Sequence, residues 1–129
     1  MILLDTSFLI DYFRGIDGAQ TIVDDDVPVI TTITYHEILA GAKRSKGRSE
    51  ERFFRNFFQK IDILGFDSHA AEESGTIAAK LAALGTPVNT MDVLIAGIAL
   101  AQGVTDIVTG DEDFLEIEKI SDIRVRIFP

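Results

Sequence analysis

Four carboxylic acids lie where a short strand-like segment ends or where a helix follows it, namely Asp5, Glu37, Asp92 and Asp111. Asp5 directly follows the apolar residues 2–4, and Asp111 comes shortly after the strand-like residues 107–109. Carboxylates that crowd together raise one another's pKa unless a hard cation neutralises them. Mg²⁺ and Mn²⁺ prefer oxygen ligands. The pattern indicates metal-assisted phosphodiester hydrolysis, in which an ion activates water and stabilises the leaving oxygen.

Each of these acids also has an ordinary structural explanation. Thr34 and Glu37 have the spacing of a capping box, in which the glutamate reaches back to a backbone N–H. Asp92 follows Thr90, an expected helix cap, and the helix dipole stabilises a negative charge there. The other two acids suit N-cap positions themselves (Asp5 and Asp111). Only the joint placement of the four acids favours a catalytic site.

Hydroxyl side chains accompany the acids. Thr6 and Ser7 follow Asp5, and Thr109 lies two positions before Asp111. Such hydroxyls can orient a carboxylate or a water bound to an ion. The same residue types are equally common at helix starts and in turns. They are candidates for a supporting role around the site.

Other catalytic chemistries lack the residues they need. The chain has no cysteine, which excludes a disulfide framework, a thiolate zinc site and a cysteine nucleophile. Neither of the two histidines belongs to a recognisable serine-histidine pattern, and no G-x-S-x-G turn is present. The ten glycines form neither of the phosphate loops G-x-x-x-x-G-K-[ST] and G-x-G-x-x-G.

Short apolar segments alternate with longer helical patterns along the chain. The expected strands are residues 2–4, 27–30, 61–66, 107–109 and 124–128, and the expected helices are residues 6–15, 17–26, 33–43, 49–59, 68–85, 91–102 and 111–118. This alternation predicts an α/β fold, a three-layer α/β/α sandwich around a short, mostly parallel sheet. We expect residues 1–129 to form a single domain. Sites in such folds lie outside the carboxyl ends of the strands, where the four acids are expected.

Charge is distributed unevenly along the chain. The formal net charge of −9 argues against broad nucleic-acid binding. Residues 43–60, however, hold seven of the twelve basic and two of the 21 acidic residues, a local charge of +5. This basic segment is either a solvated helix face or a contact for an anionic partner. The longest apolar run, residues 93–101, is half of the roughly 18 residues that a membrane span needs, so we expect a cytoplasmic protein with no membrane partner.

A stripe of four phenylalanines lies in the basic segment at positions i, i+1, i+4 and i+5: Phe53, Phe54, Phe57 and Phe58. Aromatic stripes with helical spacing usually belong to a core. The interleaved Arg52 and Arg55 favour two alternatives, a groove for a partner protein and a surface on which bases stack.

Four sequence motifs resemble the successive motifs of PIN-domain ribonucleases, in particular VapC-like toxins of toxin–antitoxin pairs: MILLDTSFLI, TTITYHEILAGA, MDVLIAGIALAQG and IVTGDEDF. They occur in the family's order and cover essentially the whole chain. The resemblance implies a single-domain α/β endoribonuclease, usually a homodimer, that cuts RNA with Mg²⁺ or Mn²⁺ and is inhibited by a cognate antitoxin. A PIN-like interaction or RNA-binding module without catalysis is the alternative, because retained motifs do not prove turnover.

The resemblance also implies roles for particular residues. Its catalytic and metal-binding acids fall on Asp5, Glu37, Asp92 and Asp111, and the crowded acids of TGDEDF leave Asp113 as an alternative fourth ligand. Thr6 and Thr109 match hydroxyls of the family, whereas Ser7 stands where asparagine is commoner. An antitoxin helix is expected on the phenylalanine stripe. The RNA backbone is expected to contact Lys43, Arg44, Lys46, Arg48 and Arg52.

Overall fold

A sheet of five parallel strands forms the centre of the computed structural model, which describes residues 1–45 and 48–129, with only the backbone of Arg48. The strands are β1 (Ile2–Leu4), β2 (Pro28–Thr31), β3 (Asp62–Leu64), β4 (Asp106–Thr109) and β5 (Arg124–Ile127). Their order in space is β3-β2-β1-β4-β5. Every neighbouring pair is parallel, so the sheet is all-parallel where the sequence predicted a mostly parallel one.

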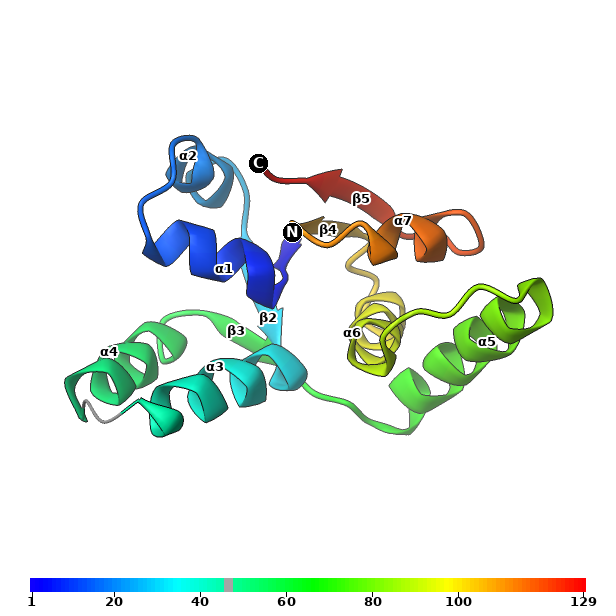
Figure 1. The fold of residues 1–129 in the computed structure, drawn as a ribbon, viewed down its shortest axis with the longest axis horizontal. Helices are drawn as coiled ribbons and strands as arrows, with labels where there is room; N and C mark the ends of the chain where they lie inside the picture. Colours follow the sequence, from blue (N-terminus) through cyan, green and yellow to red (C-terminus); the bar gives the residue numbers. More distant parts are fainter. Residues whose placement is uncertain (46–47) are drawn as a thin grey trace.

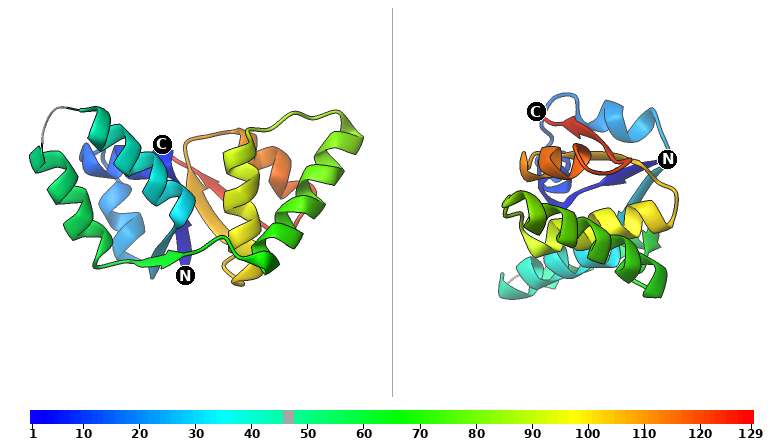
Figure 2. Two further views of the ribbon diagram at one scale, coloured as in Figure 1. Left: turned by 90° about the horizontal axis from the view of Figure 1, so that it is seen from below. Right: turned by 90° about the vertical axis from the view of Figure 1, so that its right-hand side faces the viewer.

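Seven helices within the described residues cover the two faces of the sheet. They are α1 (Thr6–Phe13), α2 (Ala19–Asp24), α3 (Thr32–Arg44), α4 (Arg48–Phe58), α5 (Ser68–Leu84), α6 (Thr90–Ala101) and α7 (Asp113–Glu118). Figures 1 and 2 show α1 to α4 on one side of the sheet and α5 to α7 on the other. The three layers predicted from the sequence are therefore present. In this described part of the chain, no helix has the length and apolar character that crossing a membrane requires.

Both faces of the sheet are apolar, because successive side chains of a strand point to opposite sides. Leu3 of β1 and Ile107 of β4 belong to a core shared with α5, α6 and α7. Leu4 and Val108, one position further along each strand, belong to a second core formed with α1 to α4. Burial on both faces explains why the strands are short uninterrupted apolar runs in the sequence.

Polar residues and glycines set the limits of the helices. The side chain of Asp67 accepts a hydrogen bond from the Ala70 N–H at 2.9 Å, as expected for the cap of α5. That helix ends at Gly85, whose φ of +67° suits glycine. The prediction that Thr90 caps α6 is wrong by one residue, because the side chain of Asn89 accepts the Met91 N–H instead.

The strand order reverses between β1 and β4. From β1 the chain adds β2 and β3 toward one edge of the sheet. It then crosses to β4 and β5, which extend the sheet from β1 toward the opposite edge. In open parallel sheets, ligands bind outside the carboxyl ends of the strands at such a switch point. Asp5 directly follows β1 and Gly110 directly follows β4, so the first and fourth motifs meet at this position.

Candidate functional site

Asp5 is buried at the end of β1 and is held by two hydroxyl groups. Its Oδ2 accepts hydrogen bonds from Thr109 Oγ1 at 2.7 Å and from Ser7 Oγ at 3.1 Å. Asp5 occupies the N-cap position of α1, but its side chain makes no capping hydrogen bond. The two hydroxyl groups therefore orient the carboxylate at the switch point.

Thr109 and Ser7 tie the ends of β1 and β4 together. Thr109 Oγ1 accepts the Asp111 N–H at 2.9 Å, and Ser7 Oγ accepts the Gly110 N–H at 2.9 Å. The two hydroxyl oxygens lie 3.1 Å apart. Both hydroxyls thus lie next to Asp5, where the sequence placed them, and they limit the rotation of its carboxylate.

Burial raises the pKa of Asp5, because the charged form loses its hydration. The hydrogen bonds from the Thr109 hydroxyl, the Thr6 N–H and the Ser7 hydroxyl act in the opposite direction, since they favour the charged form. The negative charge of Glu37 adds to the rise in pKa. Asp5 is thus an acid whose charge is costly in the absence of a nearby cation.

Asp92 is buried with one oxygen that lacks a donor. It lies in the first turn of α6 with 8% of its surface exposed, and its Oδ2 has no hydrogen-bond partner among residues 1–45 and 48–129. Burial, and then the charges of Asp5, Asp111 and Asp113, raise the pKa of Asp92 to about 8. The helix dipole at this position does not offset these effects. A buried acceptor without a donor needs an explanation such as an ion.

Asp111 and Asp113 meet Asp92 at the carboxyl edge of the sheet. The three residues each offer a carboxylate oxygen within 4.8 Å of the others. Asp111 Oδ1 accepts the Asp113 N–H at 2.9 Å, and α7 begins at Asp113 instead of Asp111. Asp111 and Asp113, between which the sequence left the choice of ligand open, both lie with Asp92.

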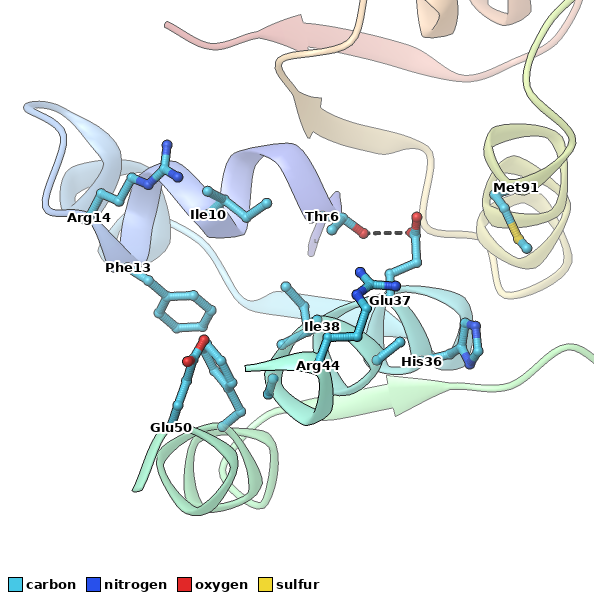
Figure 3. Close-up of a pocket in the computed structure, with 14 residues that line it drawn as sticks. Thr6, Ile10, Phe13, Arg14, His36, Glu37, Ile38, Arg44, Glu50 and Met91 are labelled. Carbon is cyan, nitrogen blue, oxygen red and sulfur yellow. Dashed lines mark hydrogen bonds between the residues drawn. The ribbon is translucent and has the colours of Figure 1, made fainter. Parts of the chain in front are cut away.

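Glu37 lies outside this group of three acids. It projects from the second turn of α3 and accepts a hydrogen bond from Thr6 Oγ1 at 2.8 Å, drawn as a dashed line in Figure 3. The capping box expected with Thr34 does not form, because Thr31 is the N-cap and its side chain accepts the Thr34 N–H. Glu37 is instead turned toward α1, where its charge acts on Asp5.

The acids provide a set of ligands that suits a hard divalent cation. All of the candidate ligand atoms are carboxylate oxygens. Mg²⁺ and Mn²⁺ prefer such ligands, whereas softer metals prefer nitrogen or sulfur. The unpartnered oxygen of Asp92 and its raised pKa are the observations that favour a cation, because positive charge would offset the repulsion among the acids. Asp92, Asp111 and Asp113 would hold the ion, near enough to Asp5 for the charge of Asp5 to act on Asp92.

A groove of about 680 Å³ opens next to Thr6 and Glu37, between α1, α3 and α4. Figure 3 shows Thr6 and Glu37 toward one end of it and Arg14 toward the other. Arg14 is a lining residue that the sequence analysis missed. Sequence patterns do not single out one arginine outside the basic segment. Only the packing of α1 beside α3 shows that this side chain lines the groove.

The basic segment contributes less free positive charge than its sequence suggests. Lys43 Nζ lies 2.8 Å from Glu51 Oε1 in an exposed ion pair. Arg44 lines the groove, and Arg52 is exposed on α4. Two expected RNA contacts, namely the whole of Lys46 and the side chain of Arg48, lie outside the described residues.

The phenylalanine stripe belongs mostly to the core. Phe58 is 3% exposed, and Phe54 and Phe57 are half buried against the core of α1 to α4. Phe58 therefore has no surface to offer a partner, because α4 turns it toward the sheet. Phe53 is 54% exposed and is the most accessible member of the stripe.

Comparison with known proteins places this fold and site in a family. The family model described as PIN domain matches residues 2–120, and the chain belongs to the PIN-domain family. Two curated proteins named tRNA(fMet)-specific endonuclease VapC are similar to it. The one from Salmonella typhimurium is 35% identical over 97 residues, covering 74% of this chain and 71% of that protein. The one from Shigella flexneri is 31% identical over 96 residues, covering 74% and 70%.

Solved structures share the architecture. A chain of the DNA-bound VapBC complex from Salmonella typhimurium matches with a TM-score of 0.81 at 28% identity, covering 98% of this chain and 96% of that one. A chain of VapBC2 from Rickettsia felis, bound to a promoter DNA fragment, matches over the full length of both chains with a TM-score of 0.83. At 20% identity, the second match concerns the fold alone. The resemblance seen in the four sequence motifs is confirmed.

Proposed function

We propose that the protein is a metal-dependent endoribonuclease and the toxin of a toxin–antitoxin pair. The observation that carries the proposal is the meeting of Asp92, Asp111 and Asp113 at the switch point of a PIN fold, with an unpartnered oxygen on Asp92. The names of the two VapC relatives support nuclease activity and favour a tRNA as the RNA substrate. The VapBC complexes among the similar structures favour an antitoxin protein as partner.

Each acid has a proposed role. Asp92, Asp111 and Asp113 hold Mg²⁺ or Mn²⁺, and Asp5 adds a fourth carboxylate whose orientation is set by its two hydroxyl partners. An ion bound there supplies the positive charge and Lewis acidity that phosphodiester hydrolysis needs. Glu37, held through one oxygen by Thr6, borders the groove, where its other oxygen can accept a hydrogen bond from water or a ribose hydroxyl.

Cleavage of RNA should require added metal. With Mg²⁺ or Mn²⁺, the protein should cut at least one member of a panel of tRNAs and unstructured RNAs, and EDTA should abolish the cutting. Asp5→Asn should lower the cleavage rate by roughly 100-fold or more, because the amide no longer offers an anionic oxygen beside the ion. The measurement is gel electrophoresis of end-labelled RNA over time.

Asp17→Asn is the matched control, because Asp17 is an exposed acid before α2 that lies outside the proposed site. It should cut RNA at the wild-type rate. Metal-independent cutting, or full activity of Asp5→Asn, would contradict the proposal. If no RNA is cut and calorimetry detects no metal binding, the protein is the non-catalytic PIN-like module.

An antitoxin contact on α4 is proposed to involve Phe53. This ring is exposed and packs edge-on against Phe13 and Phe54, so it extends the aromatic surface of the groove outward. Phe53→Ser should weaken binding of the cognate antitoxin about tenfold or more, since exposed aromatic anchors dominate such interfaces. Calorimetric titration checks this, with Phe66→Ser, which removes another exposed ring, as control. Equal affinity of the Phe53 variant and the wild type would place the antitoxin elsewhere.

A homodimer and a cytoplasmic location complete the proposal. The homodimer rests on the family resemblance of the four sequence motifs. The location rests on the proposed RNA substrate and antitoxin, both of which are made inside the cell.

A further inference from the structure

Two arginines in the groove have no role in the chemistry proposed above. Arg14 follows the last residue of α1, and Arg44 lies in the last turn of α3. In the part of the chain that the structure describes, neither guanidinium forms an ion pair, although the net charge of the protein is −9. A guanidinium without a carboxylate partner presents a planar set of N–H donors that suits phosphate oxygens.

The groove leads away from the acids along two helices. Both α1 and α3 begin at the carboxyl edge of the sheet, and Figure 3 shows them forming opposite walls. Arg14 is eight positions after Thr6, and Arg44 is seven positions after Glu37, so each arginine lies about 10–12 Å further along its helix. A stacked nucleic-acid strand advances about 3.4 Å per nucleotide. The arginines are therefore about three nucleotides away from the acid end of the groove.

Aromatic rings line the same groove as the two arginines. Phe13 and Phe54 line the groove, and their ring centroids are 5.0 Å apart. Both rings are half buried, so part of each remains accessible. Proteins that bind single-stranded nucleic acid combine a basic groove for the backbone with aromatic rings on which bases stack. The groove has both features within one short stretch.

The groove also contains two acids, and each already has a donor. Glu37 accepts from Thr6 at the metal end, and Glu50 accepts from Ser45 Oγ at 2.8 Å near the other end. Neutralising Glu50 tests the sign of a partner's charge. It should raise the affinity of the groove for an anionic strand and lower its affinity for a cationic segment.

We propose that an unpaired segment of the RNA substrate, flanking the cleavage site, lies in this groove, with Arg14 and Arg44 on its phosphates and Phe13 and Phe54 against its bases. The inference rests on the proposed ribonuclease function and specifies the form of its substrate. An RNA with an unpaired flank of about three nucleotides should bind more tightly than the same RNA with a blunt, fully paired end.

The test measures RNA affinity in the Asp92→Asn background, so that cleavage does not interfere. Labelled stem-loop RNAs carry unpaired flanks of zero to about six nucleotides on the 5′ or the 3′ side, and fluorescence anisotropy gives the Kd at several salt concentrations. Affinity should rise with flank length up to about three nucleotides and then level off. Adding Arg14→Gln and Arg44→Gln should remove this rise, weaken binding of the flanked RNA roughly tenfold, and lower the salt slope by about 1.4.

Two comparisons isolate the groove. Lys60→Gln with Arg124→Gln removes the same positive charge at the amino ends of β3 and β5, opposite the acids, and should leave the flank effect intact. Glu50→Gln should strengthen binding of the flanked RNA. All five substituted side chains are exposed, so the folded state should be retained, which thermal melting checks.

Equal affinities and salt slopes for the parent and the arginine variant would overturn the inference. So would a flank effect lost equally in the control pair, or no RNA binding by the parent. Loss of antitoxin binding with RNA binding unchanged would assign the groove to the protein partner and likewise overturn it. Because affinity is measured without cleavage, a wild type that binds flanked RNA through the arginines but cuts nothing would contradict the ribonuclease proposal alone.

Discussion

Asp92→Asn should abolish metal-dependent RNA cleavage and, at the same time, stabilise the metal-free protein. The amide has the shape of the carboxylate and keeps the packing of α6, but it removes the charge that Asp5, Asp111 and Asp113 repel. The variant also lacks a ligand for the proposed ion, so the cleavage rate should fall roughly 100-fold or more. A residue that lowers stability but is needed for activity is expected at a functional site.

The gain in stability should depend on pH. The pKa of Asp92 is raised from 3.8 to about 8 in the folded protein, so the folded state holds a proton between these values that the unfolded state has lost. The free energy of unfolding of the metal-free wild type should therefore fall as pH rises from about 4 to about 8. Asp92→Asn avoids this loss and should be more stable by a few kcal/mol, on the order of 5 kcal/mol, at pH 8, with little difference at pH 4.

Urea denaturation in EDTA at pH 4 and pH 8 measures the free energy of unfolding of the wild type and of Asp92→Asn. Glu112→Gln is the control, because Glu112 is an exposed acid of the same motif outside the group of three, and it should behave as the wild type. Added Mg²⁺ should raise the melting temperature of the wild type more than that of Asp92→Asn. A wild type equally stable at both pH values, or a variant that cuts RNA normally, would refute this account of Asp92.

Gly97→Ala should destabilise the fold by about 3 kcal/mol or more. Gly97 lies in α6 where this helix packs against α5, and a Cβ there would lie 2.6 Å from Ser74 Cβ and 2.8 Å from the Ala70 carbonyl oxygen. Ser74 is buried, and the carbonyl belongs to the backbone of α5, so neither neighbour can move without shifting a helix. Since α6 also carries Asp92, metal binding should weaken together with stability.

Gly75→Ala tests the same change without the close approach. Gly75 lies on the exposed side of α5, where a Cβ would meet nothing within 4 Å. This variant should be more stable than the wild type by roughly 0.5–1 kcal/mol, because alanine restricts the unfolded chain. Thermal and urea denaturation compare the two variants. A Gly97→Ala protein as stable as the wild type would show that α5 and α6 can separate at little cost.

The layer structure could be predicted because each strand carries its own signal. Residues 2–4 are apolar on both sides, which is possible only for a strand covered by helices on both faces, and this is where β1 lies. The exact limits of the elements could not be predicted in the same way. Asn89 and Thr90 are both suitable caps for α6, and the backbone geometry of the preceding loop, which sequence patterns do not report, selects Asn89.

In the candidate site, too, some features could be predicted from local sequence patterns and others depend on the tertiary structure. The spacing of Asp5 and Asp92 relative to their strand and helix was sufficient to place both at the carboxyl edge, because local periodicity defines where a strand ends and a helix begins. The partner of Glu37 could not be read from spacing. A capping box with Thr34 was locally reasonable. Glu37 instead accepts a hydrogen bond from the hydroxyl of Thr6, which is 31 positions earlier in the chain.

The sequence by itself determined the order of the elements, the apolar character of the strands and the position of the acids at their ends, since all of these depend on residues that are neighbours in the chain. Only the tertiary structure decided that Asp113 joins Asp92 and Asp111, that Phe58 is buried while Phe53 is exposed, and that Arg14 lines the same groove as Arg44. The physical reason is that these relations depend on how α1, α3, α4 and α6 pack against the sheet, which brings together residues far apart in the chain.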